Sequence, residues 1–168
     1  MTPIQTQRLN IRQYNTMDAA FVLRLLNEPS FIQNIGDRMV RTEEAARNYI
    51  DARFVSSYRQ NGYGLYMVET SEGIPVGMCG LVKRDPNEDP DIGFAFVPES
   101  WRRGFAFEAA TAVMYQAKNV LQLRRVLGIC IPGNTASRAT LEKLGLKLIR
   151  MDVSSETQEP ICVYEILL

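Results

Sequence analysis

The sequence predicts one mixed α/β domain that spans residues 1–168. Three observations support this fold class. The length of 168 residues suits a single hydrophobic core. Apolar residues recur alternately with a strand period and a helix period, in the order β-α-α-β-β-β-α-β-α-β-β. The chain also contains no internal repeat, low-complexity tract or linker that would divide it.

The first third of the chain predicts one strand and two helices. Residues 8–12 alternate polar and apolar side chains, as a half-buried strand does. Thr16 is predicted as the N-cap of a helix that runs to Leu26, and Asn27-Glu28-Pro29 ends it. Thr42 is predicted as a second N-cap, before apolar residues at helical spacing as far as Phe54.

The middle of the chain predicts three strands, over residues 65–68, 76–82 and 91–97. Gly77 and Gly80 lie inside the second of these strands, where they indicate a bulge or a close approach of another backbone. Residues 85–90 contain two prolines among polar side chains and predict a loop.

The last third predicts two helices and three strands. A long helix begins at Ala106, and an apolar strand follows over residues 126–131. Asn134 is predicted to cap a short helix that ends at Gly145, a suitable residue for a helix C-terminus. Two strands, over residues 146–153 and 161–167, complete the domain.

Composition excludes several classes of protein. Nineteen basic and nineteen acidic residues give a net charge of zero, which argues against a nucleic-acid-binding protein. No apolar run approaches the ~18 residues of a membrane span, and the N-terminus lacks the apolar run of a signal peptide. We therefore expect a cytoplasmic protein. The three cysteines lie far apart and predict small buried thiols rather than a metal or redox site.

The chain contains no histidine. A Ser-His-Asp triad, a Cys-His pair and a His-ligated metal are therefore excluded. Any proton transfer must use Asp, Glu, Tyr, Lys, Ser, Cys or water.

The stretch VPESWRRGFAFEAA, from Val97 to Ala110, suggests an anion site. A helix N-terminus carries unbonded N–H groups and a partial positive charge, Gly104 has no Cβ, and Arg102 and Arg103 add charge. An ordinary strand-to-helix turn with two solvated arginines is an equal alternative. The phosphate motifs GxxxxGK[ST] and GxGxxG (after a strand) are absent, which argues against a nucleotide triphosphatase and a dinucleotide-dependent dehydrogenase.

A second polar pair lies at the start of the next helix. Asn134 and Ser137 are three residues apart, so both can point from one end of that helix. If the preceding strands are neighbours, both helix starts lie along one sheet edge. A ligand with a pyrophosphate at one helix and a reactive end near the other would then fit. The alternative is that Asn134 is only a helix cap.

Together these motifs resemble the GNAT superfamily of acyl-CoA-dependent N-acyltransferases. The similarity covers nearly the whole chain and lies closest to the branch that includes the N-terminal acetyltransferases of ribosomal proteins. It implies a mostly antiparallel sheet of about seven strands, splayed between the fourth and fifth, with about four helices. The motifs that carry the resemblance are TQRLNIR (6–12), DIGF (91–94), PESWRRGFA (98–106), NTAS (134–137) and EKLG (142–145).

The resemblance also implies roles for individual residues. Backbone N–H groups would hold the pyrophosphate of coenzyme A, while Val97 and Asn134 would contact its pantetheine arm. The family often has Tyr seven residues after the Asn as the acid for the departing thiolate; here Leu141 stands there, and Ser137 is the substitute the branch suggests. The pyrophosphate residues are Arg102, Arg103, Gly104, Phe105 and Ala106.

The implied reaction moves an acetyl group from acetyl-CoA to a primary amine by direct attack on the thioester, without a metal. Asp91 is the candidate base, acting through water; it could equally anchor the preceding loop, and Glu69 is an alternative base. A protein or peptide α-amino group is the expected acceptor, because it loses its proton more easily than lysine does. The alternatives are a small-molecule amine (polyamine or drug) or a non-catalytic acyl-CoA sensor. We expect a monomer or homodimer.

Overall fold

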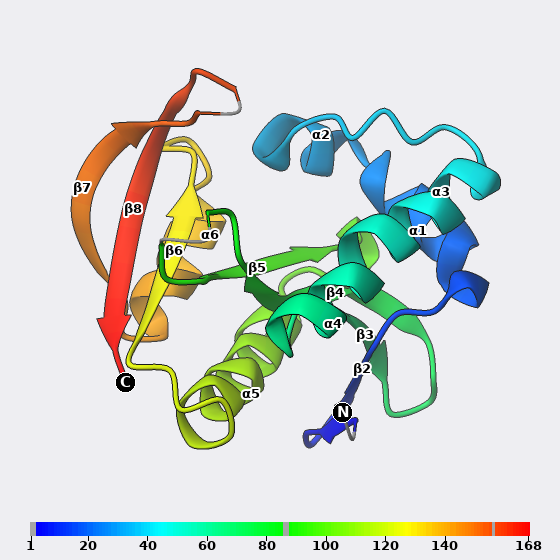
Figure 1. The fold of residues 1–168 in the computed structure, drawn as a ribbon, viewed down its shortest axis with the longest axis horizontal. Helices are drawn as coiled ribbons and strands as arrows, with labels where there is room; N and C mark the ends of the chain where they lie inside the picture. The colour runs from blue at the N-terminus through cyan, green and yellow to red at the C-terminus, as the bar shows by residue number, and fades with distance from the viewer. Residues whose placement is uncertain (1–2, 86–87, 156) are drawn as a thin grey trace.

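The computed structural model describes residues 3–85, 88–155 and 157–168 (Figure 1). Its centre is an eight-stranded sheet with the strand order β1-β2-β3-β4-β5-β6-β8-β7. All neighbouring strands are antiparallel except β5 and β6, which are parallel. The strands are β1 (Ile4–Gln5), β2 (Leu9–Arg12), β3 (Leu65–Thr70), β4 (Pro75–Val82), β5 (Asp91–Phe96), β6 (Arg125–Cys130), β7 (Lys147–Val153) and β8 (Pro160–Leu167).

Helices connect these strands and cover both faces of the sheet. They are the 3₁₀ helix η1 (Thr16–Asp18), α1 (Ala19–Leu26), α2 (Pro29–Ile35), α3 (Glu43–Tyr49), the π-helix η2 (Ile50–Val55), α4 (Ser56–Asn61), the 3₁₀ helix η3 (Pro98–Ser100), α5 (Phe105–Asn119) and α6 (Thr135–Lys143). The predicted order of elements is confirmed, with α2 as an addition. Pro29 was predicted to end a helix, but it is the first residue of α2, a position that needs no backbone N–H donor.

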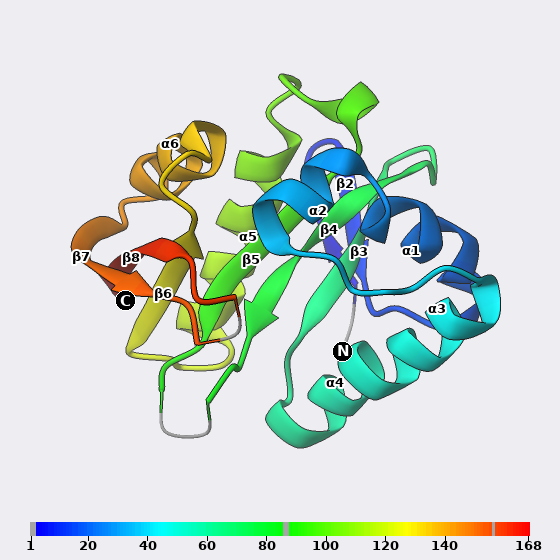
Figure 2. The same cartoon turned by 90° about the horizontal axis from the view of Figure 1, so that it is seen from above.

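The sheet separates two hydrophobic clusters. Helices α1 to α4 lie on one face, where Val22, Ile50 and Phe54 pack against Met67 and Met78. Helices α5 and α6 lie on the other face, and their apolar residues belong to a cluster with residues of β4, β5 and β8. Figure 2, a view turned by 90°, shows both helical layers with the sheet between them. The helices that precede β3 therefore cover one face of the sheet, and the helices that follow β5 cover the other.

The mostly antiparallel sheet of the predicted fold is confirmed, with eight strands in place of about seven. The additional strand is β1, whose two residues pair with Asn10 and Ile11 and are too few to show a period in the sequence. The expected splay between the fourth and fifth predicted strands, which are β5 and β6, is also present. The register joins these strands only at Asp91 and Leu127, and Figure 1 shows them diverging beyond that point.

The helix caps agree with the sequence at two positions and differ at one. Thr42 caps α3 and Asn134 caps α6, each by accepting a hydrogen bond from the backbone N–H three residues later. Thr16 is not the first cap. Asn15 takes that role, because its side chain accepts from Met17 N–H while Asp18 accepts from Asn15 N–H in a capping box.

The two glycines of β4 allow neighbouring strands to approach closely. A Cβ at Gly80 would lie 2.0 Å from the carbonyl oxygen of Gly64, and one at Gly77 would lie 2.4 Å from that of Ala95. The register between β3 and β4 also shifts next to Gly77. The prediction of close backbone approach is therefore confirmed.

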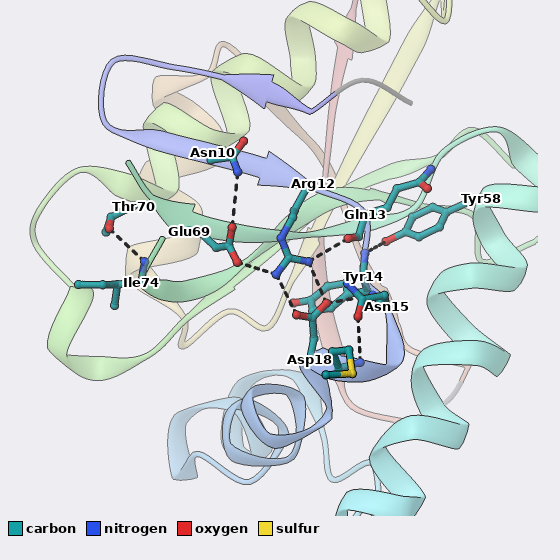
Figure 3. A network of polar contacts seen from close by, with 11 residues as sticks. Asn10, Arg12, Gln13, Tyr14, Asn15, Asp18, Tyr58, Glu69, Thr70 and Ile74 are labelled. Carbon is teal, nitrogen blue, oxygen red and sulfur yellow. Dashed lines mark hydrogen bonds and ion pairs between the residues drawn. The ribbon is translucent and has the colours of Figure 1, made fainter. Parts of the chain in front are cut away.

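An arginine between two carboxylates joins β2 to β3 and to η1 (Figure 3). The guanidinium of Arg12 donates to both oxygens of Asp18, at 2.9 and 2.8 Å, and to Glu69 at 2.5 Å. The carboxylate side chains are only 9% and 12% exposed. These hydrogen bonds raise the pKa of Arg12 above its usual value. The network fixes the start of the helical layer against the sheet.

No helix in the described part of the chain combines the length and apolar character that crossing a membrane would require.

We predict that Arg12→Met lowers the free energy of unfolding by about 3 kcal/mol, because it leaves two largely buried carboxylates without their cation. Urea denaturation measures this loss.

The matched control is Arg47→Met. Arg47 pairs with Glu43 on the surface of α3 at 3.0 Å, and loss of such an exposed pair costs about 0.5 kcal/mol. Equal losses for the two variants would contradict a structural role of the Arg12 network.

Candidate active site

The divergence of β5 from β6 leaves the backbone of β5 facing a gap. Val97 N–H donates to Val76 on β4, whereas the carbonyl of Pro90 accepts from Leu127 N–H on the β6 side. Backbone groups alternate in direction along a strand. The N–H and C=O groups of Phe94 and Phe96 therefore point toward β6, and because they lie beyond the single pairing at Asp91 they face the gap.

A loop with two left-handed residues follows β5 and leads into α5. Arg102 has φ +59° and Gly104 has φ +80°. Gly104 is the N-cap of the 15-residue helix and offers no side-chain cap. In the described chain, no protein acceptor is within hydrogen-bond distance of the N–H groups of residues 102–107. These N–H groups, the helix dipole and two arginines suit a diphosphate, so the residues present fit the phosphates of coenzyme A.

The N-terminal segment supports this loop through an ion pair that the sequence analysis did not predict. Arg8 contacts Glu108 of α5 at 2.6 Å and donates to the carbonyl of Arg103 at 2.8 Å. Thr6 also donates to Glu108, at 2.6 Å. Burial by itself would raise the pKa of Glu108, but the hydrogen bonds from Thr6 and Arg8 outweigh it and lower that pKa. The negative charge of Glu108 is thus compensated locally, next to the helix N-terminus.

The guanidinium groups of Arg8 and Arg103 both lie over the ring of Phe105, at 4.9 and 4.7 Å from its centroid. Trp101 ties the start of the loop to β5, because its indole N–H donates to the carbonyl of Phe96 at 2.7 Å. That bond satisfies one of the β5 groups that face the gap. Arg8 and Glu108 are about one hundred positions apart, so no local pattern indicated their contact.

The first turn of α6 carries the second predicted pair. The side chain of Asn134 accepts from Ser137 N–H at 3.1 Å, which confirms Asn134 as the cap. Tyr164 of β8 fixes the helix against the sheet, because its hydroxyl accepts from Arg138 at 3.1 Å and donates to Glu142 at 3.1 Å. These bonds fix the helix that carries Ser137, which lines the cleft.

Leu141 is part of the hydrophobic core. It is 1% exposed, and its methyl groups lie 2.7 and 3.0 Å from where a Cβ on Gly128 would be. A tyrosine at position 141 would need space that this packing does not provide. The absence of the usual family tyrosine is therefore built into the contact between α6 and β6.

Asp91 lies at the start of β5 and is 3% exposed. Arg84 donates to its two oxygens at 2.8 and 3.2 Å. Burial raises the pKa of Asp91, and the positive charge of Arg84 opposes that rise without cancelling it. The alternative base, Glu69, is held by Arg12 and is not among the residues that line the cleft.

A cleft of about 1110 Å³ brings part of the predicted site together. Asp91, Asn134 and Ser137 all line it, with Phe94 from β5 and Cys130 from β6. Its other wall comes from α1, α2 and the segment from α3 to α4. Val97 and the loop residues 102–106 are not part of its lining. They follow the end of β5, about 20 Å from Asp91 at ~3.3 Å per strand residue.

The parallel direction of β5 and β6 places the starts of α5 and α6 at the same end of the two strands. The sequence analysis required these two strands to be neighbours for one extended ligand to reach both helix starts, and they are neighbours. Within the residues that the structure describes, no group of three or more Cys, Asp or Glu side chains is arranged to hold a metal ion.

Comparison with known proteins identifies the family. The model of the acetyltransferase (GNAT) domain matches residues 8–147. An uncharacterized N-acetyltransferase of Bacillus subtilis (strain 168), YoaA, is 28% identical over 152 residues, covering 88% of this chain and 84% of YoaA. The crystal structure of a GNAT-family acetyltransferase from Bacillus anthracis superimposes with a TM-score of 0.82 at 26% identity, covering 99% of this chain and 98% of that one.

A more distant structure shares the fold. RimL, a ribosomal L7/L12 α-N-protein acetyltransferase solved in complex with coenzyme A, has a TM-score of 0.87 at 17% identity, and the match covers 99% of this chain and 98% of RimL. Members of the GNAT family use acetyl-CoA as co-substrate. From the match over most of its length, the chain belongs to the GNAT acetyltransferase family and is an acetyl-CoA-dependent N-acyltransferase rather than a non-catalytic sensor.

Proposed function

We propose that the chain acetylates the α-amino group of a protein or peptide, as enzymes of the ribosomal-protein branch do. The main observation in support of this acceptor is that the whole chain contains no histidine. A lysine amine with a pKa of ~10.4 costs roughly 4.6 kcal/mol to neutralise at pH 7, at ~1.36 kcal/mol per pH unit. An α-amino group with a pKa of about 7.8 costs only roughly 1 kcal/mol. A site without a histidine base suits the α-amino group, because deprotonation of that group costs less free energy.

The charges of the cleft also favour a single amine over a polyamine. A polyamine site requires several carboxylates that are available to the ligand. Of the four carboxylates that line the cleft, Asp85, Glu88, Asp91 and Asp152, two are held by arginines: Asp91 by Arg84, and Asp152 by Arg150 at 3.0 Å. The acidic loop between β4 and β5 was the one acidic cluster in the sequence, and its residues 86–87 lie outside the described residues.

For acetyl-CoA we propose an extended pose along β5. The pyrophosphate would bind the N–H groups from Arg102 to Ala106, next to the cations of Arg102 and Arg103. The pantetheine arm would enter the gap between β5 and β6. The N–H of Val97 and its carbonyl are engaged with Val76 and Ser100, so Phe94 and Phe96 are better placed than Val97 for bonds to that arm. Asn134 would contact the arm from the α6 side.

For the chemistry we propose two side chains that line the cleft. Asp91 accepts the proton of the amine through water, and its raised pKa makes it a stronger base than an ordinary aspartate. The neutral amine attacks the thioester carbonyl, and an N–H of β5 stabilises the oxyanion. As the C–S bond breaks, Ser137 donates a proton to the departing thiolate in place of the missing tyrosine, and it regains a proton from the positively charged nitrogen of the tetrahedral intermediate, which becomes the neutral amide.

The proposal is tested with three acceptor classes at equal concentration: peptides with a free N-terminus, N-acetylated peptides with one lysine, and polyamines. Release of free thiol from acetyl-CoA reports turnover. We expect the first class to have a kcat/KM at least about tenfold higher than the others. Preference for spermidine-like amines or for lysine would overturn the proposed acceptor.

We predict that Gly104→Ala weakens coenzyme A binding about tenfold. The strain of a non-glycine residue at φ +80° lowers stability by about 1–2 kcal/mol. Binding is weakened by the added Cβ, which would lie 3.3 Å from the Arg8 guanidinium, where an anion would approach the backbone. Isothermal titration calorimetry measures the dissociation constant.

Gly73→Ala is the matched control. Gly73 also has φ +80°, in the turn between β3 and β4, and a Cβ there would meet no atom within 4 Å. It should lower stability to a similar degree and leave coenzyme A affinity unchanged. If both variants bind coenzyme A as tightly as the wild type, the loop is not the phosphate site.

We predict that the pH–rate profile separates the two catalytic side chains. Asp91 is active only as a carboxylate, so kcat/KM should fall as the pH drops through its raised pKa, and Asp91→Asn should remove that limb. Ser137→Ala should lower kcat about 100-fold without moving the limb.

Two further variants control for changes of charge and hydroxyl content. Asp152→Asn alters another carboxylate that lines the cleft, and Thr140→Ala removes a hydroxyl of α6 that bonds the Ala136 carbonyl at 2.9 Å. Both should retain wild-type profiles. An unchanged profile for Asp91→Asn removes Asp91 from the mechanism, and full activity of Ser137→Ala removes Ser137.

A further inference from the structure

The two walls of the cleft differ in charge. The wall from residues 26–61 contributes two charged side chains to the lining, Arg38 and Arg53, and both are cations. All carboxylates that line the cleft come from the opposite side, from the β4–β5 connection, β5 and β7. They are Asp85, Glu88, Asp91 and Asp152. The charged side chains that the helical wall contributes to the lining are therefore all basic.

Arg53 lies on an unusual piece of backbone. It belongs to the π-helix η2, in which Ser56 N–H donates to the carbonyl of Asp51, five residues before it. Short π-helical segments occur inside longer helices and are frequent at functional sites. Here the segment places Ala52, Arg53 and Phe54 consecutively on the cleft lining, while the acidic neighbour Asp51 is not part of that lining.

The charge of Arg53 is not compensated by the protein around it. Within residues 3–85, 88–155 and 157–168, no carboxylate oxygen lies within ion-pair distance of Arg53. Two other arginines of the same helical layer do form ion pairs: Arg41 with Asp37 at 2.5 Å, and Arg47 with Glu43 at 3.0 Å. On the far wall, Arg84 and Arg150 likewise bind carboxylates.

An uncompensated cation that lines a concave surface focuses its field into that space. A surface arginine that only faced bulk water would have no such effect, but Arg53 shares its lining with the apolar side chains of Phe31, Tyr49 and Phe54. The same wall thus offers an apolar contact and a guanidinium, which binds carboxylates with two parallel hydrogen bonds.

From this arrangement we infer that Arg53 is a specificity residue that binds a carboxylate of the acceptor, close to the amine that is acetylated. The chemical class of the preferred acceptor is a peptide with Asp or Glu beside its N-terminal residue. This inference rests on the proposed α-amino acceptor and adds the charge of that acceptor. Arg53 contacts the substrate in this role and takes no part in proton transfer.

The test compares three peptides that differ only at the second residue, which is Asp, Asn or Lys, together with free aspartate. The wild type should show a kcat/KM for the Asp peptide about threefold to fivefold above that for the Asn peptide, the effect of one partly solvated ion pair. The preference should shrink as the salt concentration rises, because salt screens exposed charges.

Arg53→Gln should remove the preference, chiefly through KM, and Arg53→Glu should reverse it toward the Lys peptide. The matched control is Arg59→Gln. Arg59 is an exposed arginine of α4, one to two turns further along, and it does not line the cleft. It should keep the wild-type preference. Unchanged coenzyme A affinity in each variant verifies that the fold is intact.

The outcomes separate this inference from the proposed function. If all three peptides are acetylated equally, the α-amino acceptor stands and the role of Arg53 is overturned. If no peptide reacts but free aspartate does, and Arg53→Gln abolishes that activity, the carboxylate site stands and the peptide acceptor fails. If Arg59→Gln loses the preference as fully as Arg53→Gln does, the effect is general surface charge and the inference is overturned.

Discussion

The incomplete pairing of β5 with β6 is the constraint on which the rest of the site depends. A buried backbone amide or carbonyl without a partner costs free energy. Here the two strands pair at Asp91 and Leu127 and then separate, so the edge of β5 offers hydrogen-bonding groups along a gap. One of them, the Phe96 carbonyl, is satisfied by Trp101. A ligand with amide groups along its length can satisfy the others. The fold therefore leaves part of its own sheet for a substrate to complete.

Two ion pairs lie beside the two ends of β5. After the end of β5, Arg8 and Thr6 hold Glu108 in the first turn of α5, and Arg8 also binds the Arg103 carbonyl in the preceding loop. At the other end, Arg84 holds Asp91 beside the last point at which β5 and β6 pair. Each contact neutralises a carboxylate that would otherwise repel an anionic co-substrate or destabilise the buried strand. The same ion pairs thus serve stability and the electrostatics of the cleft.

The sequence predicted most of this architecture from local patterns. Alternating residues, the Thr42 and Asn134 caps and the glycines of β4 each act over a few neighbours, and each was located correctly. Helix ends were predicted wrongly where the same residue type is common at two different positions of a helix. Pro29 can end one helix or begin the next, and Asn15 competes with Thr16 as a cap. The two residues of β1, and the contact of Arg8 with Glu108, depend on tertiary structure and have no periodic signal. Residues 102–106 lie before and at the start of α5, and Asn134 and Ser137 lie at the start of α6, while their roles toward coenzyme A stay predictions. The alternation of β5 favours Phe94 and Phe96 over Val97 for backbone bonding.

The π-helical turn has a consequence for how acceptor preference can change. A π-turn contains one residue more than the α-helical turn it replaces, and each residue rotates a helix by about 100°. Deleting one residue from Ile50–Val55 would restore a regular helix and turn a different side chain toward the cleft. The sheet, the loop before α5 and the first turn of α6 lie outside this segment and would keep their geometry. We expect insertions and deletions there to alter substrate choice among homologues while the acetyl donor stays the same.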